Sequence, residues 1–257
     1  MVNLTIDGIH LSAEEGKTIM EAAASIGVRI PRLCYLKDIN EIAACRVCLV
    51  EVEGRERLIT SCNNTVEEGM VVHTSSPRVR QARKTNVQLI LSQHDCRCAV
   101  CVRSGNCALQ KLANDMGCNS NPYEGEIEHT AFNPHFPLIR DNAKCIKCMR
   151  CVAICEKVQH CAVWDFTGVG PSTKIIVRDN LPIAEAGCAL CGQCVVHCPV
   201  GALRERDDTE TVFSALSDPT KEVVFQIAPA VRAAWGESLG LSPEQATEKR
   251  LAAAVRA

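Results

Sequence analysis

The feature that most constrains the fold of this 257-residue sequence is a cysteine motif that occurs twice. The spacing Cys-x2-Cys-x2-Cys-x3-Cys is found at residues 145–155 and again at residues 188–198. Three thiols at this close spacing can cover one face of a compact metal cluster, whereas the fourth, one turn further on, points away. The fourth cysteine of each copy is therefore available to the cluster of the other copy.

This spacing is typical of [4Fe–4S] sites in bacterial ferredoxins, in which the fourth cysteine of each run binds the other cluster. We predict one [4Fe–4S] cluster on Cys145, Cys148, Cys151 and Cys198, and a second on Cys188, Cys191, Cys194 and Cys155. The second run is followed by proline, as in ferredoxins, whereas the first is followed by Glu156. Structural zinc is the alternative, but zinc gives no reason for a duplicated run of four cysteines.

Two further groups of ligand-type residues precede the repeat. The first is predicted to hold a [2Fe–2S] cluster, with a zinc ribbon as the alternative, and consists of Cys34, Cys45, Cys48 and Cys62. Its spacing differs from the plant ferredoxin pattern but keeps a central Cys-x2-Cys with one distant cysteine on each side. The second group leaves a Cys3His zinc site and a Cys3His [4Fe–4S] cluster equally open, and consists of His94, Cys98, Cys101 and Cys107.

Three cysteines are left over, and no catalytic residue is predicted. Cys96 lies in the loop of the second group, where it is an alternative ligand to Cys98. Cys118 and Cys161 have no partner at ligand spacing, so we interpret them as small buried apolar residues.

The 18 cysteines also bear on the compartment. The sequence starts without a basic segment followed by an apolar run, and it has no apolar stretch of about 18 residues. We therefore expect a cytoplasmic protein with no membrane span, whose cysteines bind metal instead of forming disulfides. The net charge is −2, so nucleic acid is not expected as a partner, and the basic residues of 77–84 are interpreted as a solvated helix face.

Hydrophobic patterning predicts a small sheet domain at the N-terminus. Residues 2–11 alternate around Asp7-Gly8, which predicts a hairpin, and residues 18–26 have helical periodicity. A second hairpin is predicted from residues 46–53 and 56–60. A hairpin, a helix and a second hairpin, in this order, suggest a β-grasp layout.

The rest of the chain is divided by composition and cysteine spacing. We predict a long helix at 77–94, a strand at 223–227 and a helix at 229–239. The expected fold class is α+β with five segments: a β-grasp [2Fe–2S] ferredoxin-like domain (1–77), a helical Cys3His cluster segment (78–120), a linker (121–143), a bacterial-type 2[4Fe–4S] ferredoxin domain (144–210) and a short, incomplete α/β tail (211–257).

The order of these motifs resembles the N-terminal electron-transfer region of [FeFe]-hydrogenase catalytic subunits. The large iron–sulfur subunit of respiratory complex I and some NAD-linked formate dehydrogenases begin in a similar way. The matching segments span residues 1–206 and include IPRLCYL, ACRVCLVEVEG, TSCNNTVEEGM, HDCRCAVCVRSGNCALQKLA, KCIKCMRCVAICEKVQ and CALCGQCVVHCPVGAL. The resemblance implies a [2Fe–2S] cluster in the first group and a Cys3His [4Fe–4S] cluster in the second.

The tail resembles the opening of the hydrogenase catalytic domain in the segment VVFQIAPAVRAAWGESLG, residues 223–240. We expect it to be a truncated start of that domain or a docking tail, and no hydrogen-activating site is visible. The resemblance implies an electron-transfer module in a soluble, hetero-oligomeric, NAD(P)-linked [FeFe]-hydrogenase-type complex. The implied partners are a flavin- and NAD(P)-binding iron–sulfur subunit, a small [2Fe–2S] subunit and, in a bifurcating complex, ferredoxin.

Two alternatives remain open at this point. The same iron–sulfur module is compatible with a formate dehydrogenase or another NADH-oxidising complex, with the tail as a docking element. A zinc-stabilised binding module with no redox role is the other, and it would be colourless.

Overall fold

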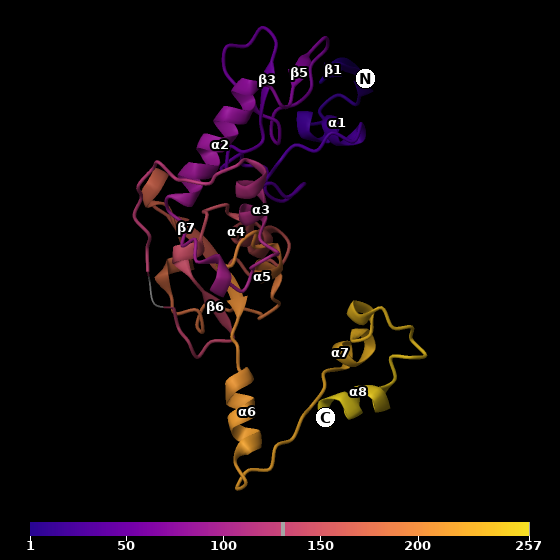
Figure 1. The fold of residues 1–257 in the computed structure, drawn as a ribbon, viewed down its shortest axis with the longest axis vertical. Coiled ribbons are helices and arrows are strands. Elements are labelled where there is room, and N and C mark those ends of the chain that lie inside the picture. The colour runs from indigo at the N-terminus through magenta and orange to yellow at the C-terminus, as the bar shows by residue number, and fades with distance from the viewer. Residues whose placement is uncertain (130–131, 257) are drawn as a thin grey trace. The chain divides into compact units, whose positions relative to one another are not determined.

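The computed structural model describes residues 1–129 and 132–256. The chain forms two compact units, Met1–Arg206 and Asp207–Ala257, and all 18 cysteines lie in the first (Figure 1). In the part of the chain that the structure describes, no helix has both the length and the apolar character needed to cross a bilayer.

The first unit begins with a five-stranded sheet of order β2-β1-β5-β3-β4. Its strands are β1 (Val2–Ile6), β2 (Ile9–Ala13), β3 (Leu49–Val52), β4 (Ile59–Thr60) and β5 (Val71–His73). Both predicted hairpins are present, as the antiparallel pairs β1–β2 and β3–β4, and β1 runs parallel to β5. The first hairpin turns at Asp7 and Gly8, both with positive φ, as a tight two-residue turn requires.

Helix α1 (Ile19–Ser25) supplies apolar side chains to the core of this sheet domain. Ile19 and Ala23 are fully buried there, together with Ile6 and Val72 of the sheet. Isoleucine, valine and alanine at these positions follow the helical and strand periods of the sequence, so patterning alone explains this half of the fold.

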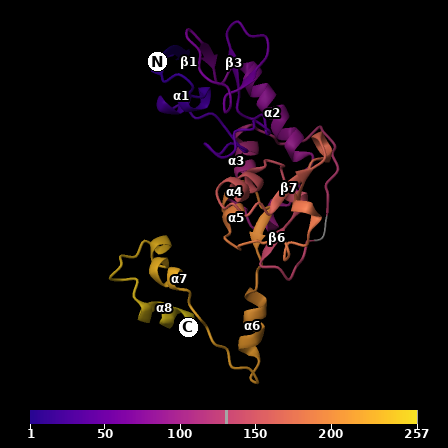
Figure 2. The ribbon, with the colours of Figure 1, turned by 180° about the vertical axis from the view of Figure 1, so that it is seen from behind.

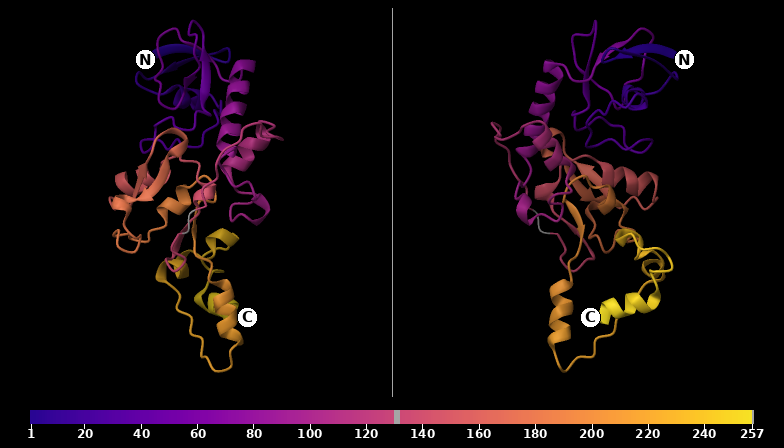
Figure 3. Two further views of the ribbon diagram at one scale, coloured as in Figure 1. Left: turned by 90° about the vertical axis from the view of Figure 1, so that its left-hand side faces the viewer. Right: turned by 45° about the vertical axis from the view of Figure 1, so that its right-hand side comes forward.

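Helix α2 (Pro77–Leu91) connects the sheet domain to the cysteine-rich half of the unit (Figures 2 and 3). Proline at its first position and the Ser76 side chain, which accepts the Val79 N–H at 3.2 Å, begin the helix. The helix ends at Leu91, three residues before the end at His94 that the sequence predicted. After Leu91 the backbone leaves the helical path, because the Asp95 N–H donates to the Ala143 carbonyl at 2.7 Å instead of to a carbonyl of the helix.

Helix α3 (Ala108–Asp115) follows, and Cys107 is its N-cap residue. Two more helices each come directly after one cysteine run: α4 (Arg150–Lys157) and α5 (Gln193–His197), which lie side by side. The antiparallel strands β6 (Leu138–Arg140) and β9 (Leu203–Glu205) pair across this region. The predicted linker is therefore regular at its end, where β6 forms.

The segment between the two cysteine runs forms an antiparallel hairpin of β7 (Trp164–Thr167) and β8 (Lys174–Val177). Trp164, Val163 and Ile175 of this hairpin region are 2% exposed or less and belong to the apolar core of the cysteine-rich half. Short 3-10 turns occur at Cys98–Val100, Asn142–Lys144, Gly170–Ser172, Arg178–Asn180 and Glu237–Leu239.

The second unit contains α6 (Thr209–Ser217), α7 (Pro229–Ala234) and α8 (Glu248–Arg256). The strand predicted at 223–227 is wrong, because an extended segment needs a neighbouring strand and residues 207–256 provide none. The helix predicted at 229–239 is divided in two, since α7 ends at Ala234 and a separate 3-10 turn follows. The Trp235 indole donates to the Ala246 carbonyl at 3.2 Å and holds this small unit together.

Candidate metal centres

The first group of cysteines gathers in loops at one end of the N-terminal sheet. Cys34 precedes the loop that leads to β3, Cys45 and Cys48 lie in that loop, and Cys62 follows β4. The Cys48 and Cys62 sulfur atoms are 3.3 Å apart. Cys34, Cys48 and Cys62 are 1% exposed or less, whereas Cys45 is half-buried.

Hydrogen bonds within the first group already favour thiolates. The bond with the Cys34 thiol lowers the pKa of Cys45 to about 6, and the bond with the Cys62 thiol lowers that of Cys48 to about 7. In each pair the partner that holds the proton, Cys34 or Cys62, has a raised pKa. Because iron and zinc bind the thiolate form, one thiol of each pair is ready to ligate a metal, and its partner would lose its proton when the metal binds.

The second group lies between α2 and α3. Cys98 and Cys101 flank a 3-10 turn, and Cys107 caps α3 by accepting the Gln110 N–H at 3.5 Å. Burial raises the pKa of Cys98, and the nearby Cys107 and Cys101 raise it further, as expected for thiols brought close together. Gly201 packs against this group, and a Cβ there would stand only 2.7 Å from the Cys101 sulfur.

His94 is 7% exposed, and its Nδ1 atom is buried without a hydrogen-bond partner among the described residues. Burial lowers the pKa of its imidazole, against an opposing effect of the Lys144 backbone. A neutral imidazole with a free ring nitrogen is the form that coordinates a metal, so His94 fits the predicted ligand role.

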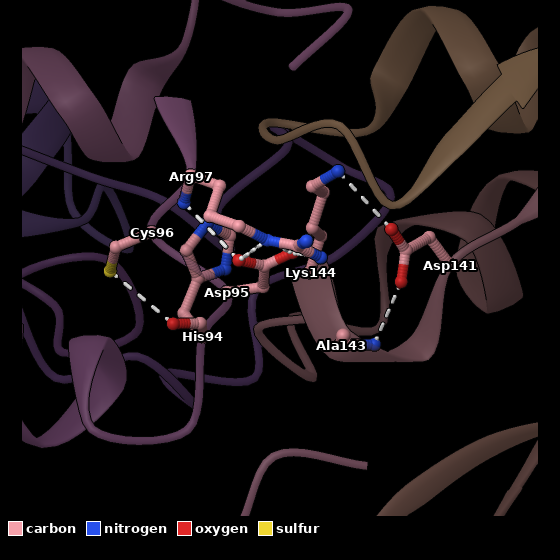
Figure 4. Close-up of polar contacts among 7 residues, drawn as sticks. All are labelled: His94, Asp95, Cys96, Arg97, Asp141, Ala143 and Lys144. Atoms are coloured by element: carbon pink, nitrogen blue, oxygen red, sulfur yellow. Dashed lines mark hydrogen bonds and ion pairs between the residues drawn. The ribbon is translucent and has the colours of Figure 1, made fainter. Parts of the chain in front are cut away.

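Neighbouring residues hold the loop around His94 through further polar contacts (Figure 4). Asp95 forms an ion pair with Arg97 at 2.8 Å, and Lys144 forms one with Asp141 at 3.2 Å. The Cys96 thiol donates to the His94 backbone carbonyl at 3.3 Å, and Cys96 is exposed. The Cys96 thiol is therefore hydrogen-bonded to the backbone of its own loop.

The repeated motif encloses two cavities. One, of about 250 Å³, is lined by Cys155, Cys188, Cys191 and Cys194. The other is lined by Cys145, Cys148, Cys151 and Cys198. Each lining contains three cysteines of one run and the fourth of the other run, which are the two sets expected from the ferredoxin spacing. Across the described residues, no group of three or more His, Cys, Asp or Glu side chains is arranged to hold a single metal ion.

Cys161 also lines the first of these cavities, which the sequence did not predict. It is half-buried, and its thiol donates to the Gln159 carbonyl at 3.4 Å. Cys161 lies just before β7, and the position of the β7–β8 hairpin brings it to this cavity. Its spacing from the other cysteines matches no ligand motif, so the sequence could not identify it. Cys118 is likewise half-buried.

Buried side chains connect the first group to the repeated motif. Asn40 is 2% exposed, and its amide donates to the carbonyls of Cys34 at 2.8 Å and Cys148 at 3.0 Å. Arg150 donates to the carbonyls of Cys34 and Tyr35 at 3.3 and 3.0 Å. These contacts hold a cysteine of the sheet domain beside one of the second cavity.

The second group is connected to the same cavity from another direction. Arg103 donates to the Cys198 carbonyl at 2.7 Å, and the Ala108 N–H donates to the Pro199 carbonyl at 3.0 Å. Asn40, Arg103 and Arg150 belong to no recognisable motif, because their role is to bond backbone carbonyls that only the folded chain brings near.

Three family profiles match the chain. They are the 2Fe-2S iron-sulfur cluster binding domain at residues 1–77, the NADH-ubiquinone oxidoreductase-G iron-sulfur binding region at 83–122 and the 4Fe-4S dicluster domain at 144–202. Their order along the chain agrees with the cysteine groups, and it identifies ferredoxin-like domains of mixed α and β content.

Individual proteins match over longer stretches. The NADP-reducing hydrogenase subunit HndD of Solidesulfovibrio fructosivorans is 44% identical over an alignment of 262 positions, which covers 100% of this chain and 45% of that protein. Iron hydrogenase 1 of Clostridium pasteurianum is 34% identical over 92% of this chain and 42% of its own length. The chain thus spans less than half the length of these two relatives.

A solved structure, that of an NAD+-reducing [NiFe]-hydrogenase in the H2-reduced state, superposes with a TM-score of 0.71. It is 26% identical, and the match covers 80% of this chain and 87% of that one. Together these similarities confirm the resemblance predicted from the motifs. The chain belongs to the iron–sulfur family represented by the N-terminal region of the NADP-reducing hydrogenase subunit HndD, and it is related to an iron–sulfur subunit of NADH-quinone oxidoreductase.

Proposed function

We propose that this chain is the electron-transfer module of a multisubunit, NAD(P)-linked [FeFe]-hydrogenase-type complex, with one [2Fe–2S] and three [4Fe–4S] clusters. The observation that carries the proposal is the pair of cavities in the repeated motif, each lined by four cysteines drawn from both runs. Bound iron–sulfur clusters supply one-electron carriers, with potentials between about −700 and +450 mV.

The proposed ligands are the sets expected from the sequence. The [2Fe–2S] site consists of Cys34, Cys45, Cys48 and Cys62. The Cys3His [4Fe–4S] site consists of His94, Cys98, Cys101 and Cys107. The remaining two sites are Cys145, Cys148, Cys151 with Cys198, and Cys188, Cys191, Cys194 with Cys155. The lowered pKa values of Cys45 and Cys48 and the free Nδ1 of His94 support the first two sets.

In the same proposal, residues 1–77 form a β-grasp domain, 78–120 the Cys3His segment, 121–143 a linker and 144–210 a bacterial-type ferredoxin domain, with 211–257 as the tail. The mixed sheet with α1 packed on it supports the first of these assignments. The short paired strands β6 and β9 beside α4 and α5 support the ferredoxin domain.

The contacts between the cysteine groups support a junction role for the proposed site of Cys145, Cys148, Cys151 and Cys198. Asn40 links it to the first group through Cys34, and Arg103 links it to the second group through Cys198. We therefore place this site between the two upstream groups and the site of Cys188, Cys191 and Cys194 in the electron path.

The proposed partners follow from the relatives. A flavin- and NAD(P)-binding iron–sulfur subunit and a small [2Fe–2S] subunit would deliver or accept electrons at the N-terminal sites, and ferredoxin is a further exchange partner. The hydrogenase assignment has support from the alignments with HndD and iron hydrogenase 1, which span 100% and 92% of this chain.

Iron and sulfide analysis of the anaerobically purified chain, with EPR of its reduced form, tests the cluster content. We expect about 14 iron atoms per chain, one [2Fe–2S] signal and three [4Fe–4S] signals. A colourless protein containing zinc would contradict the proposal.

Paired substitutions test the crossed ligand sets. Cys198→Ser and Cys145→Ser should alter the same [4Fe–4S] signal, whereas Cys155→Ser and Cys191→Ser should alter the other. Cys118→Ser is the matched control and should leave all signals unchanged. If Cys198→Ser instead altered the signal that depends on Cys191, the two runs would each bind their own cluster and the crossed assignment would be wrong.

A further inference from the structure

Arg150 places a positive charge beside two of the cysteine groups at once. It lies between Cys148 and Cys151 in the sequence, at the first position of α4, and it is half-buried. Its guanidinium Nε donates to the Cys34 carbonyl at 3.3 Å, and its Nη2 donates to the Tyr35 carbonyl at 3.0 Å. Arginine keeps its proton in proteins, so this charge is permanent.

A third donor of the same guanidinium reaches the end of the second cysteine run. The Nη1 atom of Arg150 donates to the His197 carbonyl at 3.4 Å, directly before Cys198, and Cys198 lines the same cavity as Cys148. The hydrogen bonds therefore fix the charge beside Cys34 of the first group. They also fix it beside the proposed site of Cys145, Cys148, Cys151 and Cys198 (the junction site).

The chain supplies no carboxylate to balance this charge in the part that the structure describes. The hydrogen bonds of Arg150 all go to neutral backbone carbonyls, and the first turn of α4 contains no acidic residue. The helix dipole opposes a cation at this end of a helix, because it favours cations near the C-terminus. A partly buried cation needs a negative partner, and the thiolates of the two neighbouring cysteine groups are of the required sign.

We propose that Arg150 is a counter-charge shared by the first group and the junction site, and that it raises the reduction potentials of both. This inference rests on the proposed cluster content. Four thiolates around an iron–sulfur core give a site net negative charge, and the electron that enters on reduction adds to it. A cation nearby therefore favours the reduced form of each site. Arg150 is a positioning residue and not a ligand.

Redox titration of the full chain, followed by EPR, tests the shared role. Arg150→Gln removes the charge and keeps a hydrogen-bond donor. At the potential where each signal is half reduced in the wild type, we expect the reduced-to-oxidised ratio to fall about three- to tenfold, where tenfold corresponds to about 59 mV. This fall should occur in the [2Fe–2S] signal and in the Cys145-dependent [4Fe–4S] signal, and the Cys191-dependent signal should shift less.

Two further variants separate the charge from the hydrogen bonds. Replacement of Arg150 by citrulline, inserted at an amber codon, keeps the planar shape and the N–H groups that donate to Cys34 and Tyr35, but it removes the charge. Both signals should therefore shift as in Arg150→Gln. Arg150→Lys keeps the charge and loses the planar set of donors, so both signals should stay near their wild-type potentials.

Lys157→Gln is the matched control within α4. Lys157 donates to the Ile39 carbonyl at 2.7 Å, so it also joins this helix to the loop that follows Cys34, but it is exposed. Water and salt screen an exposed charge, so this substitution should shift neither the [2Fe–2S] signal nor the Cys145-dependent signal.

The outcomes distinguish this inference from the proposed function. Unshifted ratios in the citrulline protein, with all clusters present, would overturn the counter-charge and leave the cluster content intact. A shift of only one of the two signals would overturn the shared role, and equal shifts in Lys157→Gln would assign the effect to helix contacts instead of to Arg150. If Arg150→Gln fails to fold, the citrulline protein decides. Absence of [2Fe–2S] and [4Fe–4S] signals from the wild type would overturn both proposals.

Discussion

Asn40 shows how single residues join sites that are far apart in the sequence. Its buried amide bonds the carbonyls of Cys34 and Cys148, so it acts on the backbone of two cysteines and leaves their sulfurs free. An asparagine amide has two donor hydrogens, and both are used here. The same amide therefore fixes the spacing between the sheet domain and the cysteine-rich half.

Asn40→Ala should lower the free energy of unfolding by about 1–3 kcal/mol, because two buried carbonyls lose their donor. Denaturant unfolding of the iron-loaded chain, kept anaerobic, measures the difference. Asn119→Ala, at an exposed position, is the matched control and should change stability by less than about 0.5 kcal/mol. Equal effects of the two substitutions would contradict the bridging role.

Gly201 makes a second residue-scale prediction. A methyl group at this position would lie 2.7 Å from the Cys101 sulfur, so Gly201→Ala should displace Cys101 and weaken the EPR signal of the Cys3His site. The other signals should remain. Gly16→Ala, which has positive φ but open space around it, controls for backbone strain alone and should leave every cluster signal in place.

At the scale of elements, α1 begins with a complete capping box. The Thr18 hydroxyl accepts the Glu21 N–H at 3.2 Å, and the Glu21 carboxylate accepts the Thr18 N–H at 3.0 Å. The bond from the Thr18 backbone is the main cause that lowers the pKa of Glu21. Both residues are visible in the sequence as the Thr-x-x-Glu signature of a helix start.

Thr18→Ala should destabilise the sheet domain by about 1 kcal/mol, since it leaves helix N–H groups without an acceptor. The contribution of Glu21 is present above its unfolded pKa of 4.5 and is lost as the pH falls through its lower folded pKa. Urea unfolding at pH 7 and pH 4 checks both effects. In Glu21→Gln the pH-dependent part should disappear, and its persistence would assign it to other groups.

Elements that local signals determine could be predicted from the sequence, whereas those that depend on distant contacts could not. The hairpin at Asp7-Gly8 and the start of α1 follow from turn and capping residues. The end of α2 could not be predicted, because the Asp95 bond to Ala143 draws the chain away. The cysteine spacing indicated which thiols share a cavity, but it could not identify Trp164, which reaches both cavities through an inserted hairpin.

At the scale of the whole molecule, the first unit has two cores of different composition. The core of the sheet domain is formed largely by aliphatic residues of β1, β3 and α1, and it includes two buried cysteines, Cys48 and Cys62. The core of the cysteine-rich half includes Cys155, Cys194 and Cys198 among its buried members, and further cysteines pack against it. We therefore expect metal ligation to contribute more to the folding free energy of the second core than to that of the first.

Removal of iron by a chelator should affect the two halves unequally. We expect amide hydrogen exchange to increase at least tenfold in α4 and α5, and to change much less in β1 and β2, because aliphatic packing holds the hairpin without metal. Mass spectrometry of peptides from the loaded and stripped chains measures this. Uniform loss of protection across residues 1–206 would instead indicate a single cooperative core.

The sharing of cysteines between the two runs has a consequence for how the protein is made. Cys198 lines one cavity and Cys155 lines the other. During synthesis, therefore, neither cavity has its full set of thiols until the second run has left the ribosome. The cavity of the first run waits with three of its four cysteines in place until Cys198 is made, and a chain interrupted before Cys194 has no complete ferredoxin-type site to offer the machinery that delivers iron and sulfide.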